Sequence, residues 1–298
     1  MEQFLQAVIN GFALAAIYAL IALGFVIIYK ATQVLNFAQP ALLLLGGYWI
    51  VYFTEIWQMN FWIALGAGAT MAAVTGIMVE RTVLRPMVGK PVFAVAIVTI
   101  GLNTVITIFA LDLMGLEIRQ MGDPWGLDAI SIGSVSIAHR QIAAVFAVAI
   151  LVGLLLAFFK YSRMGLAMRA ASFDQEVALT QGVSVSAVFA MSWAIAAVLA
   201  MFGGVFLGSG IGFSESVRVS ALKALPVVVV GGLDSIPGAI VGAIIVAQAE
   251  VMVATYQTTP LLSWTGQGFS QVVPYLVMFV VLLVRPYGLF GTKEVERV

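Results

Sequence analysis

Residues 3–29 form an apolar run of 27 residues that contains no charged side chain. A helix rises about 1.5 Å per residue and the hydrocarbon core of a bilayer is about 30 Å thick, so this run is long enough to cross a membrane. Glu2 precedes the run and no Lys or Arg does, which is unlike the basic start of a cleaved signal peptide. We expect a span that remains in the mature protein.

Seven further apolar stretches predict helices: 38–54, 61–79, 91–111, 141–159, 185–208, 236–256 and 271–284. Another, 224–232, is too short to cross alone and predicts a half-span. Because 62% of the 298 residues are hydrophobic, the composition allows at most about nine crossings of roughly 20 residues each. The sequence predicts an all-α, polytopic helical membrane protein with one transmembrane domain over 1–298. We expect about eight full transmembrane helices plus one broken or re-entrant element.

The basic residues predict the orientation, because cytoplasmic loops carry an excess of Lys and Arg. If the C-terminal tail is cytoplasmic, ten of the fourteen lie inside: Lys30, Arg81, Arg85, Lys90, Lys160, Arg163, Arg169, Arg285, Lys293 and Arg297. The acidic-leaning loop 112–140 then lies outside together with the N-terminus. This alternation requires segment 218–232 to cross the membrane or to join the next helix at membrane depth.

Several functional classes are excluded by residues that the chain lacks. It has no cysteine and a single histidine, His139, so thiol chemistry and a zinc site of paired histidines are absent. Gly89-Lys90 is followed by Pro91, which rules out a phosphate-binding loop of the form GxxxxGK[ST]. Because its net charge is zero, the chain has no excess of basic residues that would bind nucleic acid. We expect a protein that is not an enzyme and that binds no metal or cofactor itself.

Charged residues are scarce inside the predicted spans. This argues against a proton-coupled pump or a voltage sensor and favours a pathway for a neutral or zwitterionic solute. Glu250, near the outer end of its helix, is a partial exception. It either extends to the membrane interface, lines a pathway or pairs at a subunit interface.

Two polar, proline-containing interruptions occupy corresponding positions in the two halves. Segment 33–40 (QVLNFAQP) and segment 231–238 (GGLDSIPG) each precede an apolar helix. Irregular backbone at membrane depth is tolerated only where it is buried in protein or lines a cavity. The pair predicts an internal repeat with a site near its interface, and ordinary interfacial turns are the alternative. The polar residues expected to line or brace a pathway are Asn36, Gln39, Asp234, Ser235 and, on the fourth span, Asn103 and Thr107, with Glu250.

The inside loop 160–184 is amphipathic. It opens with three basic residues, favours helix from Met168 to Gln181 and has a natural helix stop at Gly182. Phe173, Val177 and Leu179 would be exposed among charged residues. Such a helix lies on a membrane surface or enters the groove of a partner, and the composition leaves both open.

This loop also carries a resemblance to a family. Residues 176–182 (EVALTQG) match the E-x-A-x-x-x-G spacing of the loop by which permeases of bacterial ABC importers contact their ATPases, although the downstream I-x-L-P is missing. Five ordered blocks, covering nearly the full length, resemble the branched-chain amino acid ABC transporter permeases. They read NGFALAAIYALIALGFVIIY, LNFAQPALLLLGGYW, SRMGLAMRAASFDQEVALTQGV, VVVVGGLDSIPGAIVGAIIVAQAE and VLLVRPYGLFG. Family members often have Gly at the position of Pro40.

The resemblance implies a permease of the bacterial inner membrane that works by alternating access. Its partners would be a second related permease subunit, two cytoplasmic ATPase subunits that bind ATP and Mg, and an extracytoplasmic substrate-binding protein. Residues 169–182 would form the coupling helix. Phe173 and Leu179 would then seat in the ATPase groove, with their orientation fixed by Arg169, Asp174 and Glu176 and the helix ended by Gly182.

Two rival functions stay open at this point. One is a single-chain secondary transporter or channel for a small neutral or zwitterionic solute, which would transport without ATPase partners. The other is a membrane scaffold, which would give no reason for paired polar helix breaks. The substrate is also open, because the wider family includes transporters of branched-chain amino acids, other amino acids, amides and urea.

Overall fold

The computed structural model describes residues 1–133, 135–173, 175–210, 212–257, 266 and 268–292. Within this part of the chain, six helices are long and apolar enough to cross a membrane. They are α1 (Glu2–Thr32), α3 (Phe61–Val79), α4 (Val92–Met114), α5 (His139–Tyr161), α8 (Val185–Gly208) and α11 (Ile236–Tyr256). Beyond α3, a π-helical turn, η2 (Glu80–Leu84), and a 3₁₀ turn, η3 (Arg85–Met87), continue the chain. The prediction of a polytopic helical membrane protein is confirmed.

The two remaining apolar stretches also form helices, but shorter ones. They are α2 (Gln39–Val51), with 13 residues, and α12 (Val273–Val284), with 12. A π-helical turn, η1 (Tyr52–Ile56), extends α2. All eight predicted stretches are therefore helical, but the count of eight full crossings is not confirmed. The predicted broken element is present as α10 (Ala224–Gly231), an eight-residue helix that follows the six-residue α9 (Ser216–Ala221).

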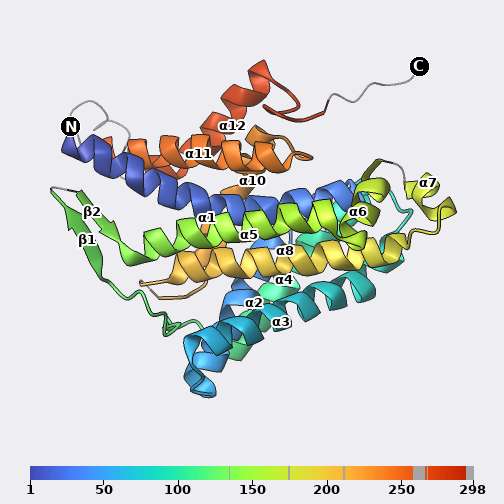
Figure 1. Ribbon diagram of the computed structural model, residues 1–298, viewed down its shortest axis with the longest axis horizontal. Helices are drawn as coiled ribbons and strands as arrows, with labels where there is room; N and C mark the ends of the chain where they lie inside the picture. The colour runs from blue at the N-terminus through green and yellow to red at the C-terminus, as the bar shows by residue number, and fades with distance from the viewer. Residues whose placement is uncertain (134, 174, 211, 258–265, 267, 293–298) are drawn as a thin grey trace.

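The remaining described elements lie at the two ends of the molecule. At one end, β1 (Ala129–Ile132) pairs antiparallel with β2 (Val135–Ala138), with Ala129 opposite Ala138. This hairpin was not predicted from the sequence. At the opposite end lie α6 (Arg163–Phe173) and α7 (Gln175–Thr180) (Figure 1). A 3₁₀ turn, η5 (Phe269–Gln271), leads into α12.

The core is built around α1, α2 and α8. Helix α1 packs along both α11 and α8, and α2 packs against α8, α3 and α4. In α2 every residue except Trp49 is buried, as expected of a helix that is apolar on all sides. By contrast, α3, α4 and α5 leave large apolar side chains exposed, including Ile63, Ile108 and Ile150. In a membrane these faces contact lipid or another subunit.

Helices α10 and α11 pack so closely that two glycines are required. A Cβ atom at Gly238 would lie 2.3 Å from the carbonyl oxygen of Gly231, and one at Gly242 would lie 2.5 Å from that of Val227. This spacing of small residues lets two helix backbones touch, as in other membrane helix pairs. The half-span is therefore held against the full helix that follows it.

Candidate translocation and coupling sites

The first helix break joins α1 to α2 and is closed by buried amides. Gln33 takes a left-handed conformation with φ of 57° after the last turn of α1, and Pro40 lies in the first turn of α2. Asn36 Oδ1 accepts from the backbone N–H of Ala38 at 2.9 Å, which stabilises the turn. Asn36 Nδ2 donates to Gln39 Oε1 at 3.2 Å. Asn36 and Gln39 thus lie at the break between α1 and α2, where the fold brings them into contact.

Two further contacts attach this break to neighbouring helices. Gln39 Nε2 donates to the carbonyl oxygen of Ala196, in the middle of α8, at 3.1 Å. The hydroxyl of Thr99, on α4, accepts from the backbone N–H of Phe37 at 3.1 Å. Asn36 and Gln39 are almost completely inaccessible, so unpaired polar atoms would be costly there. The role of Thr99 was not predicted, because nothing in its local sequence marks it.

A small cavity of about 110 Å³ adjoins the first break. Its lining includes Asn36, Thr99, Glu80, Lys90, Gln175 and Trp193. Glu80 is buried and accepts two hydrogen bonds from Arg85, from Nε at 3.2 Å and from Nη2 at 3.0 Å. Since the two residues are five apart, the π-helical turn after α3 brings them onto one side. The sequence does not reveal this ion pair, because residues 80–85 have the composition of an ordinary charged loop.

The second helix break joins α10 to α11. Gly232 ends α10 with φ of 108°, and Ser235 Oγ caps α11 by accepting from the backbone N–H of Gly238 at 3.1 Å. The carboxylate of Asp234 accepts from both the backbone N–H and the hydroxyl of Thr292. Lys30 Nζ donates to the carbonyl oxygen of Asp234 at 3.1 Å. Asp234 and Ser235 therefore brace this break.

Both breaks lie beside the C-terminal end of α1. The first begins directly after α1, at Gln33, and the second is reached by Lys30 from the last turn of that helix. The two pairs of predicted residues, Asn36 with Gln39 and Asp234 with Ser235, share no hydrogen bond in the described part of the chain. They are connected through α1, so a displacement of its last turn changes the surroundings of both breaks.

Glu250 is buried and paired within the same chain. Its Oε2 accepts from the hydroxyl of Tyr18, on α1, at 2.7 Å, and its Oε1 accepts from Lys223 Nζ. Lys223 directly precedes α10, so this ion pair holds the start of the half-span against α11. Sequence reasoning missed both Lys223 and Tyr18, since their sequence separation from Glu250 gives no local signal.

The two weaker candidates lie together on α4. The hydroxyl of Thr107 donates to the backbone carbonyl of Asn103 at 2.7 Å, a contact within the helix. Asn103 Oδ1 is buried and has no hydrogen-bond partner among the described residues. Asn103 therefore presents an open acceptor, whereas Thr107 is satisfied by its own helix.

The inside loop is helical over Arg163–Phe173 and Gln175–Thr180, so the helix starts at Arg163 rather than at the predicted Met168. Asp174 lies outside the described residues, and so does the side chain of Glu176. Phe173 is 93% exposed, and Arg169 and Leu179 are exposed as well. Gly182 has φ of 80° and follows the last turn of α7, which fits its predicted role as a stop. Gln175 Nε2 donates to the carbonyl oxygen of Ala31 at 3.1 Å, which links α7 to the end of α1.

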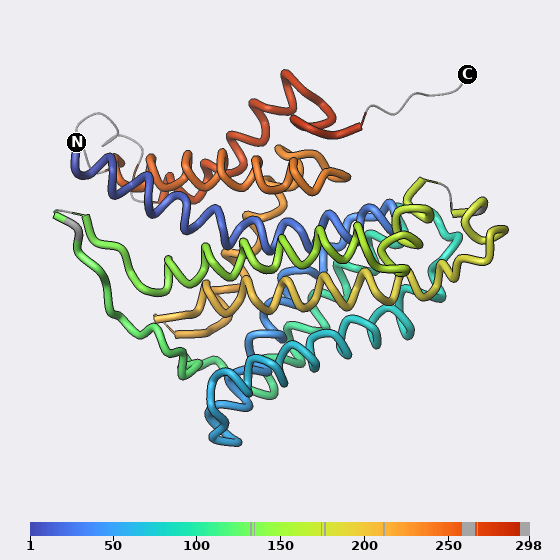
Figure 2. The backbone as a smooth tube through the Cα atoms, viewed as in Figure 1, coloured from blue at the N-terminus to red at the C-terminus, as the bar shows by residue number. Residues whose placement is uncertain are grey.

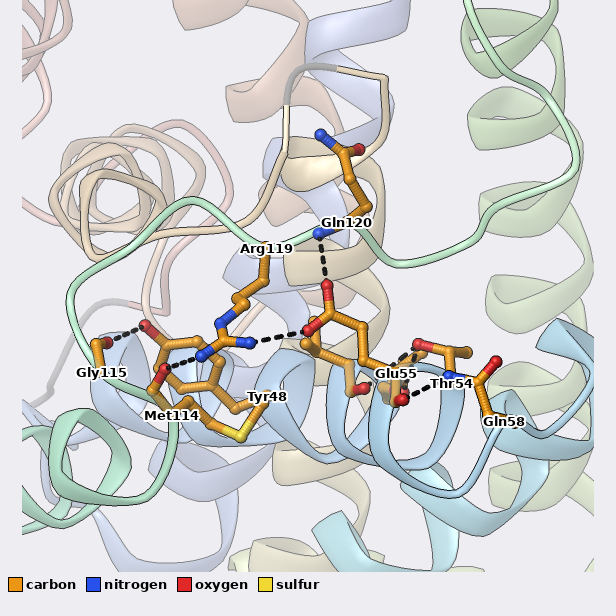
Figure 3. Close-up of polar contacts among 10 residues, drawn as sticks. Tyr48, Thr54, Glu55, Gln58, Met114, Gly115, Arg119 and Gln120 are labelled. Carbon is orange, nitrogen blue, oxygen red and sulfur yellow. Dashed lines mark hydrogen bonds and ion pairs between the residues drawn. The ribbon is translucent and has the colours of Figure 1, made fainter.

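At the opposite end of the molecule, the chain after α4 is fastened across the end of α2 (Figure 3). Arg119 Nη1 lies 3.1 Å from Glu55 Oε2, and the backbone N–H of Gln120 donates to Glu55 Oε1 at 3.1 Å. The backbones of Arg119 and Phe213 exchange two hydrogen bonds, at 2.9 and 2.7 Å. These contacts join three separate segments into a cap over this end, which sequence reasoning did not predict.

Comparison with known proteins decides the class of the molecule. A family model described as the branched-chain amino acid transport system permease component matches residues 7–282. The chain belongs to this family. It is 31% identical to the high-affinity branched-chain amino acid transport system permease protein LivH of Salmonella typhimurium, with 99% of this chain and 98% of the relative aligned. With BraD of Pseudomonas aeruginosa, a permease protein of the same description, identity is 29% over 99% and 98%.

Among solved structures, the chain is similar to PsaBC from Streptococcus pneumoniae in complex with Fab. The TM-score is 0.49 at 12% identity, with 96% of this chain and 92% of that chain covered. Membership of the permease family identifies this chain as a transporter subunit and not an enzyme. Its apolar helices place it in a membrane.

Proposed function

We propose that this permease is the membrane subunit of a bacterial ABC importer that moves branched-chain amino acids, or related small amino acids or amides, by alternating access. The observation that carries the proposal is the family match over residues 7–282. The relatives' names, which specify high-affinity branched-chain amino acid transport, support the substrate class. The scarcity of charged residues inside the spans fits a solute that carries no net charge.

The expected partners are a second related permease subunit, two cytoplasmic ATPase subunits and an extracytoplasmic substrate-binding protein. ATP and Mg would bind to the ATPases, since the sequence of this chain has no phosphate-binding loop of the form GxxxxGK[ST]. We place the chain in the inner membrane with its N-terminus outside and its C-terminus cytoplasmic. The concentration of Lys and Arg near α6 and the C-terminal tail supports this orientation.

Residues 160–184 would form the cytoplasmic loop that contacts an ATPase, with the coupling helix at 169–182. Phe173 and Leu179 would enter the ATPase groove, while Arg169, Asp174 and Glu176 orient the contact and Gly182 ends the helix. The exposure of Phe173 supports this role, because a large apolar side chain in water favours a partner. The hydrogen bond from Gln175 to Ala31 would pass movement of α7 to the end of α1.

The two breaks would be the parts of the pathway that change when the transporter switches state. Asn36, Gln39, Asp234 and Ser235 brace them, and Glu250 holds the half-span that leads to the second. Asn103 has an unused acceptor and Thr107 is its neighbour, so these two are candidates for lining the pathway. ATP-driven closure of the ATPases would then shift the populations of inward-facing and outward-facing states.

The first test is to purify the tagged chain from its native membrane in mild detergent, to identify what accompanies it and to measure ATP hydrolysis and uptake in vesicles. We expect a related permease and ATPases, with uptake of branched-chain amino acids that requires ATP. Recovery of the chain alone, still able to transport, would favour the single-chain secondary transporter or channel. Copurified partners without uptake of any solute would favour a scaffold.

The second test is the double variant Phe173→Ala, Glu176→Ala. We expect a folded permease in which ATP hydrolysis no longer drives uptake, because the contact with the ATPase is lost. Leu154→Ala, which removes an exposed apolar side chain from α5, is the matched control and should transport normally. Unchanged uptake in the double variant would contradict the coupling role.

A further inference from the structure

The last sequence block, VLLVRPYGLFG, has a structural role that the proposed function does not use. After α12 the chain turns back over the junction of α10 and α11 (Figure 2). The backbone N–H of Leu289 donates to the carbonyl oxygen of Val230 at 2.9 Å, and that of Phe290 donates to Gly231 at 3.0 Å. Since the last carbonyls of a helix lack partners within it, segment 286–292 completes the end of α10. We call this segment the C-terminal clasp.

The C-terminal clasp touches the half-span at backbone distance. A Cβ atom at Gly288 would lie 2.6 Å from the carbonyl oxygen of Val229, and one at Gly232 would lie 2.5 Å from the backbone nitrogen of Gly291. Thr292 completes the attachment through the carboxylate of Asp234. The clasp therefore moves with the second helix break rather than as an independent tail.

A groove of about 720 Å³ lies between the C-terminal clasp and α6. One wall carries Arg169, Ser172 and Phe173, and the other carries Pro286, Tyr287 and Thr292. Lys30 and Asp234 form part of its floor. The volume falls within the range of about 300–1,000 Å³ that is typical of ligand-binding clefts. The groove can therefore hold several side chains of a partner.

The charge of the groove indicates what kind of partner fits. Lys30 and Arg169 are two cations, against the single carboxylate of Asp234. Both oxygens of that carboxylate accept from Thr292, so Asp234 already has hydrogen-bond partners, while Arg169 is exposed. An acidic side chain entering between the walls would find two positive groups near it.

We propose that this groove binds an exposed acidic segment of the cytoplasmic ATPase, so that the C-terminal clasp forms the second half of the docking surface. The inference rests on the proposed function, since it requires an ATPase partner. The argument for that occupant is continuity, because Phe173 and Arg169 belong both to this groove and to the proposed coupling helix. An ATPase seated there would contact α6 and, through the clasp, the second helix break.

The absence of cysteine from the chain makes a direct test possible. A single cysteine is placed at Tyr287→Cys, in the clasp wall, and labelled with a photoreactive maleimide in the assembled transporter. Phe173→Cys reports the proposed coupling contact. Thr82→Cys is the control, because this exposed residue lies outside both the groove lining and the proposed ATPase-contact loop 160–184. We expect ATPase adducts from Tyr287→Cys and Phe173→Cys and at least about tenfold less from Thr82→Cys, the ratio of a contact worth about 1.4 kcal/mol.

Each outcome of this test has a separate meaning. ATPase adducts at Phe173→Cys without adducts at Tyr287→Cys would overturn the groove assignment and leave the proposed function standing. A transporter that contains no ATPase would contradict the proposed function itself. A phospholipid adduct at Tyr287→Cys, identified by mass spectrometry, would show a lipid in the groove and overturn the inference.

A second measurement tests the charge of the groove. Lys30→Glu should reduce ATPase retention during purification about tenfold, because a like charge then faces the acidic segment. Arg81→Glu changes the same charge on an exposed residue outside both the groove lining and the proposed ATPase-contact loop, and should retain the ATPase within about twofold. Equal losses in the two variants would show a general surface effect and contradict the specific site.

Discussion

The two helix breaks solve the same physical problem with different groups. The first, between α1 and α2, is almost entirely buried and contains only uncharged residues, joined by the amides of Asn36 and Gln39. The second, between α10 and α11, is partly exposed and is held by a distant segment of backbone and by charges at Lys30 and Asp234. In both, the broken helix ends find hydrogen-bond partners that the bilayer cannot supply.

This difference indicates which of the two breaks can be moved by a protein that binds at the surface. A break closed by buried amides moves only if core helices separate, because its partners lie on α8 and α4. A break held by a surface clasp can be moved from the face where the proposed ATPase would act. The second break is therefore the one we expect to change first during a transport cycle.

The largest effect should come from removing the buried charge that anchors the half-span. Glu250→Leu leaves the Lys223 ammonium without its partner and should lower the free energy of unfolding by about 3 kcal/mol. The double variant Lys223→Met, Glu250→Leu removes both charges and should recover most of that loss. Thermal unfolding in detergent measures both, and a double variant no more stable than Glu250→Leu would contradict the pairing.

Closing the space between α10 and α11 should have the next largest effect. Gly242→Ala places a methyl group 2.5 Å from a backbone oxygen, so the half-span must shift, at a cost of about 1–3 kcal/mol. Gly101→Ala, on α4, is the matched control, because nothing lies within 4 Å of its Cβ position. The control should unfold at or slightly above the normal temperature, and equal destabilisation of both would refute the packing argument.

The first break is tested by Gln39→Leu. This change leaves the amide of Asn36 without its acceptor in a buried site and should cost about 1–3 kcal/mol. Asn103→Leu removes another partly buried amide, whose Oδ1 has no described partner, and should be close to neutral for stability. If Asn103→Leu nevertheless lowers uptake while leaving the unfolding temperature unchanged, its proposed place on the pathway gains support.

The smallest effect should follow from loosening the C-terminal clasp. Thr292→Val removes one exposed hydroxyl contact with Asp234 and should cost about 0.5–1 kcal/mol. Its expected signature is faster proteolysis near the clasp with the rest of the permease unchanged. Thr104→Val, an exposed threonine that bonds only within α4, is the control. Faster proteolysis in both variants would mean that the clasp is not specifically stabilised.

The sequence predicts the parts of this fold that depend on local composition. The apolar runs predict the positions of eight of the described helices, and the prolines Pro40 and Pro237 mark the two breaks. Each signal is contained within a few residues or a single run, where ring constraint or length decides the outcome.

What the sequence does not predict depends on residues far apart in the chain. Lys223, Thr99 and the C-terminal clasp have no local signal, because their importance comes from partners that only the folded chain brings near. The hairpin of β1 and β2 was missed for a related reason, since its strands have only four residues each. The sequence thus identifies single polar residues at the breaks, but not the network of contacts that connects them, and their part in a translocation pathway stays a prediction.

The complete burial of α2 has a consequence for how the protein is made. This helix has 13 residues and is followed by only one π-helical turn, so it is shorter than the roughly 20 residues of a stable span. It is synthesised long before α8, which supplies the carbonyl partner of Gln39 and one wall of its surroundings. During synthesis, α2 therefore lacks its contacts with α8 until about 150 further residues have been made. Until then, the insertion machinery or α1 must cover its surface.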